Sequence, residues 1–234
     1  MNQYSPSTFT ARDSICRWLL SGSEDGKIII WRTKDWEPFA TLKGHTEKVS
    51  DVDIHPSGRV AISVLKDQTV RLWNLMTAKK AAVLKIKGRD HRGEAGEFVR
   101  WVNGGSHFIV GLLNMVLVYH TATAKCVRKF RFKSTLMHME PVNFDDNEWF
   151  VTAHANGRLD FFETANLLAD EAPKDLAEEV IEPKFSLVGH TNRIKDFVFY
   201  QDAQATKGVP YIVSVGSEGK IVVWDLIHRD QVAV

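Results

Sequence analysis

The sequence predicts an all-β fold: a β-propeller of about five blades, each made of four short strands. Apolar strands end in an aromatic residue at near-regular separations of 42, 46, 43 and 62 residues, at Trp31, Trp73, Tyr119, Phe162 and Trp224. A Ser or Thr lies ten residues before four of these aromatic residues, at Ser21, Ser63, Thr152 and Ser214. Gly-His pairs recur at 44–45 and 189–190, and a Trp-Asp pair stands at 224–225.

The stretch from Gly44 to Leu75 shows one repeat most completely. Three runs of β-forming residues, Val49–Ile54, Val60–Val64 and Val70–Trp73, are separated by turn signals such as Pro56-Ser57-Gly58. Pro fixes φ and Gly allows positive φ, so this tripeptide favours a tight turn. A period near 40–45 residues with Gly-His and Trp-Asp pairs is typical of WD40 repeats, which have four strands per blade.

The repeats divide the chain into five predicted blades within a single propeller domain. Their approximate ranges are 5–43, 44–88, 97–133, 134–188 and 189–234. An acidic insertion at 166–183 interrupts the fourth blade, and we expect a mobile or partly helical surface loop there. WD40 propellers usually have about seven blades, so this is either an unusually small propeller or an incomplete, N-terminally truncated seven-blade ring that lacks its first two blades. The poor inner strand between Met1 and Ile15 favours the truncated ring. Such an open arc would expose sheet faces and self-associate.

The matching offsets within the repeats place polar residues where a buried hydrogen-bond relay would run. In each relay an imidazole, a strand hydroxyl, a turn carboxylate and the strand-end Trp N–H bond in series, because buried polar groups need partners. The predicted relay residues are His45, Ser63, Asp67 and Trp73 in the second blade, His190, Ser214, Glu218 and Trp224 in the last, and Ser21, Asp25 and Trp31 in the first. The third and fourth blades lack this set, so we expect them to depend more on apolar packing.

The same residues contain the ingredients of a hydrolase triad, but a catalytic triad occurs once and this set recurs. The histidines lack zinc-site spacing, and the glycines lie in β-turns rather than in a phosphate loop. We therefore predict a protein that is not an enzyme and has no cofactor, no metal and no small-molecule substrate. No apolar run approaches the ~18 residues needed to span a bilayer, and Cys16 and Cys126 are expected to be reduced thiols.

A basic stretch on the predicted outer strand of the third blade is the candidate partner-binding rim. It consists of Lys125, Arg128, Lys129, Arg131 and Lys133. The neighbouring outer strand adds Lys79, Lys80, Lys85 and Lys87. Such a rim suits phosphates or acidic partners, although lysines also protect sheet edges from unwanted pairing. The acidic insertion could likewise dock a basic partner or be a solvated loop.

Several segments together resemble the p21-activated-kinase-interacting WD-repeat proteins. They are Ser21–Gly26, Lys34–Glu37, Ile54–Gly58, Leu72–Leu75 and Arg193–Asp196, and the likeness spans about Arg17 to Leu226. The resemblance implies a nucleolar protein acting in large ribosomal subunit assembly and, in animals, restraint of p21-activated kinase.

The leading hypothesis is a non-catalytic scaffold for large (60S) ribosomal subunit assembly and rRNA processing, located in the nucleolus or nucleus. Its implied partners are pre-ribosomal proteins and rRNA, without a membrane. The alternative is a signalling adaptor that binds and negatively regulates a p21-activated kinase, and an enzyme is a distant third.

Overall fold

A computed structural model describes residues 9–12, 17–44, 47–86, 95–169, 176–202 and 208–233. Four predicted features fall outside these ranges: the imidazole of His45, the thiol of Cys16, the side chain of Lys87 and the part of the acidic insertion at 170–175. The described chain consists of β-strands and two short 3₁₀ turns, η1 (Asn103–Gly105) and η2 (Thr164–Leu167), and those ranges contain no α-helix.

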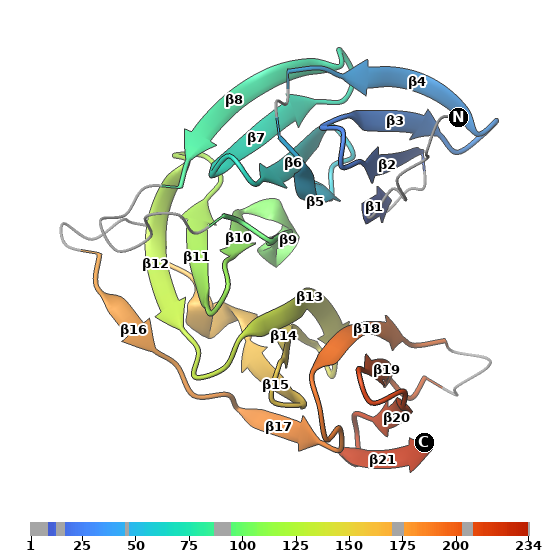
Figure 1. The fold of residues 1–234 in the computed structure, drawn as a ribbon, viewed down its shortest axis with the longest axis vertical. Helices are drawn as coiled ribbons and strands as arrows, with labels where there is room; N and C mark the ends of the chain where they lie inside the picture. The colour runs from blue at the N-terminus through green and yellow to red at the C-terminus, as the bar shows by residue number, and fades with distance from the viewer. Residues whose placement is uncertain are drawn as a thin grey trace. The chain divides into compact units, whose positions relative to one another are not determined.

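The first two sheets are four-stranded antiparallel meanders in chain order (Figure 1). The first contains β1 (Phe9–Arg12), β2 (Trp18–Gly22), β3 (Ile28–Arg32) and β4 (Glu37–Leu42). The second contains β5 (Val49–Ile54), β6 (Val60–Leu65), β7 (Thr69–Asn74) and β8 (Lys79–Lys85). The sequence around β1 favours a strand only weakly, and the antiparallel pairing with β2 holds these residues in an extended conformation.

The third sheet has a fifth strand that comes from much later in the chain. Its strands are β9 (Phe98–Val102), β10 (His107–Gly111), β11 (Met115–His120), β12 (Lys125–Arg131) and β16 (Glu178–Val180). Strand β16 lies parallel to β12 on its outer edge. The expectation of a loop or helix throughout the acidic insertion is therefore wrong at these residues, because hydrogen bonding to β12 extends them.

The last two sheets again contain four antiparallel strands each. The fourth contains β13 (Leu136–Phe144), β14 (Asn147–His154), β15 (Arg158–Glu163) and β17 (Phe185–Val188). The fifth contains β18 (Ile194–Tyr200), β19 (Tyr211–Gly216), β20 (Ile221–Asp225) and β21 (Asp230–Ala233). The prediction of an all-β fold with five repeated sheets is confirmed, and the arrangement fits a β-propeller.

Bulges recur at matching places in these repeats. The pairing register shifts directly before the Trp of three strands, at Ile30/Trp31, Leu72/Trp73 and Val223/Trp224. A bulge turns the following side chain and increases the local twist. The extra residue lies on the outer strand each time, at Phe39, Ala81 and Val232, so these three outer strands are irregular at matching places.

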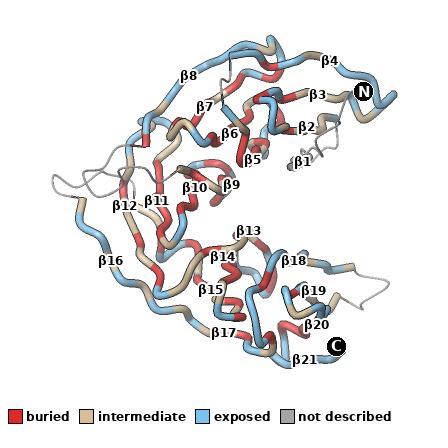
Figure 2. The backbone as a smooth tube through the Cα atoms, in the orientation of Figure 1, coloured by how far each residue is buried: buried red, intermediate tan, exposed pale blue. Residues whose placement is uncertain are grey.

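Apolar clusters lie between the first and second, the second and third, and the fourth and fifth sheets. The outer strands β4, β8 and β21 are mostly exposed (Figure 2). Leu20 and Ile30 of the first sheet pack with Trp73 of the second. Phe161 of the fourth sheet packs in one cluster with Trp224 of the fifth. Each sheet thus buries its apolar face against a neighbour, as in layered β-architectures.

The described chain forms two compact units. The first comprises residues 1–127 with 169–176, and the second comprises 128–168 with 177–234. The blade boundaries within one domain and the closure of the ring stay predictions.

Candidate functional site

The last sheet contains a continuous relay of four side chains. Trp224 Nε1 donates to Ser214 Oγ at 2.8 Å, and His190 Nε2 lies 2.8 Å from the same oxygen. His190 Nδ1 is 2.6 Å from Glu218 Oε1, and the His190 side chain is fully buried. Because a carboxylate only accepts, Nδ1 donates to Glu218, and Nε2 of a neutral ring accepts from the Ser214 hydroxyl. The hydrogen bonds therefore run in one direction, from Trp224 to Glu218.

A glycine makes room for this relay. A Cβ atom at Gly216 would lie 2.1 Å from Glu218 Oε2 and 2.5 Å from His190 Nδ1. Burial acts to raise the pKa of Glu218, but hydrogen bonds from its own backbone amide and from His190 outweigh burial and hold this pKa below its usual range. Glu218 therefore remains an acceptor at neutral pH.

In the second sheet the described contacts form two separate groups. Trp73 Nε1 donates to Ser63 Oγ at 2.9 Å. Asp67 accepts from the Thr69 amide at 3.0 Å and from Arg71 Nη2 at 3.1 Å. The Arg71 side chain is 9% exposed and also donates to the carbonyl oxygen of Gly44. Asp67 therefore holds a nearly buried guanidinium, a role that the repeat pattern did not predict.

Of the relay contacts predicted for the first sheet, the described residues form only the Trp–Ser hydrogen bond. Trp31 Nε1 donates to Ser21 Oγ at 2.8 Å. Asp25 contacts the backbone amide and the ammonium group of Lys27 instead, and hydrogen bonds from that side chain and amide lower the Asp25 pKa. Both residues of this ion pair are exposed, so Asp25 acts as a turn residue here.

The fourth sheet contains a buried polar cluster that the repeat pattern missed. Thr152 Oγ1 lies 2.9 Å from His154 Nε2, and Asp160 Oδ2 lies 3.4 Å from the same nitrogen. Ser186 Oγ donates to Asp160 Oδ1 at 2.5 Å, and Arg158 Nη2 donates to Ser186 Oγ at 2.8 Å. The imidazole comes from the same strand as the Thr and not from an upstream Gly-His pair. The available signal in the sequence was Asp160, which lies on the strand that pairs with the strand of His154.

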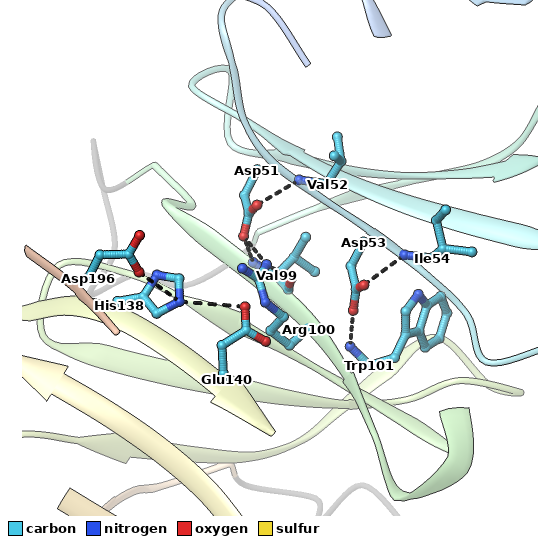
Figure 3. A network of polar contacts seen from close by, with 10 residues as sticks. All are labelled: Asp51, Val52, Asp53, Ile54, Val99, Arg100, Trp101, His138, Glu140 and Asp196. Carbon is cyan, nitrogen blue, oxygen red and sulfur yellow. Dashed lines mark hydrogen bonds and ion pairs between the residues drawn. The ribbon is translucent and has the colours of Figure 1, made fainter. Parts of the chain in front are cut away.

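Carboxylates on β5 tie the second sheet to the third (Figure 3). Asp51 Oδ2 accepts from the Val99 amide at 3.0 Å and forms an ion pair with Arg100. Asp53 Oδ2 accepts from the Trp101 amide at 2.8 Å. Alternating Asp residues in an otherwise apolar strand were the available signal, because buried carboxylates need donors.

The fourth and fifth sheets are joined at a similar place. His138 Nε2 lies 3.4 Å from Asp196 Oδ1 and 3.5 Å from Glu140 Oε1 (Figure 3). His138, Asp196 and Asp51 each follow a bulge in the first strand of their sheet. These three positions therefore correspond in the repeat.

The predicted basic rim lies along β12 and is matched by acids of the insertion. Arg128 Nε and Nη2 donate to the two carboxylate oxygens of Glu179 at 3.1 and 2.5 Å. Arg131 Nε and Nη2 donate to Glu178 at 2.8 and 3.2 Å. Lys133 Nζ lies 2.7 Å from Glu182 Oε1.

The other members of the rim differ in exposure, since Lys125 is exposed and Lys129 is half-buried. Lys79, Lys80 and Lys85 lie on β8, and Lys87 is outside the described residues. Binding of a partner to the rim stays a prediction.

The described ranges also bear on metal binding and on membrane spans. They contain no group of three or more His, Cys, Asp or Glu side chains placed to hold a metal ion. They also contain no helix long and apolar enough to cross a bilayer.

The family model for the WD domain, G-beta repeat, matches residues 13–32 and 36–74. These residues form most of the first two sheets, including the Trp31–Ser21 and Trp73–Ser63 hydrogen bonds. This chain contains WD40 repeats.

The WD40 chain is also similar to named relatives along most of its length. It is 47% identical to Protein MAK11 of Saccharomyces cerevisiae over 227 residues, which cover 93% of this chain and 53% of the relative. It is 29% identical to the p21-activated protein kinase-interacting protein 1-like of Gallus gallus, over 89% of this chain and 49% of that protein. The Xenopus laevis protein of the same name is 31% identical over 88% and 49%.

The chain is homologous to these proteins, so the predicted resemblance to the p21-activated-kinase-interacting proteins is confirmed. It spans about half the length of these curated relatives. WD40 repeats and this homology point to a non-catalytic scaffold.

Proposed function

We propose that this WD40 protein is a non-catalytic scaffold for assembly of the large ribosomal subunit, including rRNA processing, and that it works in the nucleolus. The observation that carries the proposal is the homology of this chain to Protein MAK11 and to the p21-activated protein kinase-interacting protein 1-like proteins. This homology extends over 88–93% of the chain. The likeness to p21-activated-kinase-interacting proteins implies work on large-subunit precursors. A scaffold role also agrees with the structural use of the buried histidines, since His190 is fully buried within its relay.

The proposed contact surface is the basic rim at Lys125, Arg128, Lys129, Arg131 and Lys133. Its cations suit an acidic assembly factor or phosphates of pre-ribosomal RNA. Binding through such charges weakens as salt rises. Association with precursors should therefore fall steeply between low and moderate ionic strength.

A second candidate function follows from the names of the relatives. The Gallus gallus and Xenopus laevis proteins are named for interaction with p21-activated protein kinase. The second candidate is accordingly a signalling adaptor that binds and negatively regulates such a kinase.

Affinity purification of the tagged protein from cells, with RNA and protein identified in the same sample, separates the two. The scaffold proposal predicts co-purification of large-subunit precursor RNA and assembly proteins. Recovery of a p21-activated kinase without precursor RNA would replace it with the adaptor function.

A further inference from the structure

The outer edge of β12 is occupied by a short segment of this same chain. Strand β16 pairs with it in parallel, with Lys129 opposite Glu178, Phe130 opposite Glu179, and Arg131 opposite Val180. An uncovered edge strand presents a row of backbone donors and acceptors that other strands can join. Strand β16 therefore shows how an added strand fits this edge (Figure 1).

Side chains make this pairing specific for acids. Arg128 and Arg131 each hold one glutamate of β16 through two nitrogen atoms. This fork-to-carboxylate geometry gives both strength and direction. Arg128 also stacks over the Phe130 ring, 4.5 Å from its centre, which orients the guanidinium. The edge thus combines backbone pairing with two preorganised carboxylate receptors.

The segment that occupies the edge is short and partly exposed. Strand β16 has three residues, and Val180 is 69% exposed. The Lys133–Glu182 pair is 79% and 71% exposed, and exposed ion pairs contribute only about 0–1 kcal/mol each. The segment is nevertheless part of the same chain, so its effective concentration is high, about millimolar. An external segment can therefore replace it when its own affinity or local concentration is sufficient.

We propose that the edge of β12 from Arg128 to Arg131, together with Lys133 just after it, binds an extended acidic segment of a partner protein, and that residues 177–183 are its built-in competitor. This inference rests on the proposed scaffold function and names the kind of partner and the regulation of the rim. A polypeptide fits better than RNA, because only a polypeptide can add backbone hydrogen bonds to a strand edge. The acidic segment keeps the edge covered until the partner arrives.

The direct test measures peptide binding by the purified full chain. The variant Glu178→Gln, Glu179→Gln, Glu182→Gln removes the competing charges. The control Asp145→Asn, Asp146→Asn, Glu148→Gln makes the same charge change at the turn before β14 and on that strand. The probes are a fluorescent peptide with the sequence of residues 177–183, the same peptide with Gln for each Glu, and a single-stranded RNA oligonucleotide.

The competitor variant should bind the acidic peptide about tenfold more tightly than the wild type and the control do. That factor is expected if the segment covers the edge about nine-tenths of the time. The Gln peptide should bind none of the proteins measurably. Equal binding by all three proteins, or equal binding of both peptides, would overturn the proposal. Binding of RNA but not of peptide by the competitor variant would also overturn it.

A measurement on the wild type keeps the test valid if the variant folds poorly. Excess acidic peptide should accelerate amide hydrogen exchange at residues 178–180 while residues 129–131 stay protected. Unchanged exchange at a saturating peptide concentration would contradict displacement. Both experiments use only purified protein, so their outcome is independent of whether the protein enters pre-ribosomes.

Discussion

At the scale of single residues, Asp67 illustrates how a turn carboxylate stabilises this fold. Its oxygens accept from the Thr69 amide and hydroxyl and from the Arg71 guanidinium, which is nearly buried. Removing a partner from a buried charged donor leaves that donor without compensation for its lost hydration. The stabilising effect of Asp67 therefore comes mainly through Arg71.

The substitution Asp67→Ala should lower the free energy of unfolding by about 1–3 kcal/mol. Asp67→Asn keeps an acceptor for the Thr69 amide and should cost less. Urea denaturation of the purified proteins measures both changes. If Asp67→Ala unfolds at the same urea concentration as the wild type, the carboxylate does not have this role.

His154 should make stability depend on pH. Burial lowers its pKa, and the nearby Asp160 carboxylate offsets this effect only in part. When pH falls below about 6.5, the usual histidine value, the unfolded chain binds a proton that folded His154 does not bind. Stability must then decrease as pH falls.

The matched variant is His154→Gln, which cannot titrate. Between pH 7.5 and about 5.5, the wild type should lose up to about 1.4 kcal/mol per pH unit more than this variant, the slope for one proton. Thermal or urea melts across this range measure the difference. Parallel pH profiles for the two proteins would show that His154 does not contribute.

The sequence predicted the Trp–Ser pairs because both residues lie on neighbouring strands at a fixed offset of ten. It did not predict that Asp67 faces Arg71, because a turn carboxylate has several donors within reach and tertiary packing selects among them. His154 was missed for a related reason: its imidazole reaches Thr152 from two residues away on the same strand.

At the scale of elements, the hydrogen bond between Trp and Ser occurs in three sheets with different burial. The Trp224–Ser214 and Trp73–Ser63 bonds are buried, whereas Trp31–Ser21 is only partly buried. Ser214 Oγ also lies within hydrogen-bond distance of His190 Nε2, so this hydroxyl has two hydrogen-bond partners. An unsatisfied donor costs more where water cannot replace the lost partner.

Ser214→Ala should therefore destabilise the protein more than Ser21→Ala does. We expect about 1–3 kcal/mol for Ser214→Ala and about 0.5–1 kcal/mol for Ser21→Ala. Differential scanning calorimetry of both variants under one buffer condition measures the order. The reverse order would contradict the assignment of the last sheet's relay as the more buried one.

Most strands were predictable because β-branched and aromatic residues alternate with turn signals in each repeat. Strand β16 was not, since Glu-Glu-Val has weak β-propensity and no alternating pattern. Its conformation depends on Arg128 and Arg131, which are about fifty residues away in the chain. Such a strand is determined by tertiary contacts and not by its own sequence.

At the scale of the whole molecule, the last sheet has an apolar outward face. Val215 pairs with Ile221 as Val64 pairs with Val70 in the second sheet. Val64 and Val70 are fully buried, but Val215 and Ile221 are 38% and 57% exposed. By analogy with Val64 and Val70, this face is suited to packing against another apolar surface.

This chain alone should therefore self-associate through that face. Ile221→Lys should reduce the association, because a charge placed on an apolar interface disfavours burial. Met76→Lys, at another exposed apolar side chain, is the matched control and should not reduce it. Sedimentation velocity over a range of protein concentrations gives the result. A monomeric wild type at all concentrations would contradict the prediction.

The number of sheets was predictable from the period, because each repeat contributes one four-stranded unit. Ring closure stays a prediction, because no local sequence pattern encodes contacts between terminal sheets. The rim was recognisable from the charges of neighbouring residues alone. Its pairing with the acidic residues 178–182 was not, because these contacts join residues about fifty positions apart in the chain.

Sucrose-gradient sedimentation tests the proposed scaffold function most directly. The tagged protein should migrate with large-subunit precursors at low salt, and its depletion should cause those precursors to accumulate. Replacing Lys125, Arg128, Lys129, Arg131 and Lys133 by Gln should move the protein to the top of the gradient while circular dichroism remains unchanged. A wild-type protein that stays at the top, with ribosome levels unaffected by its loss, would contradict the account.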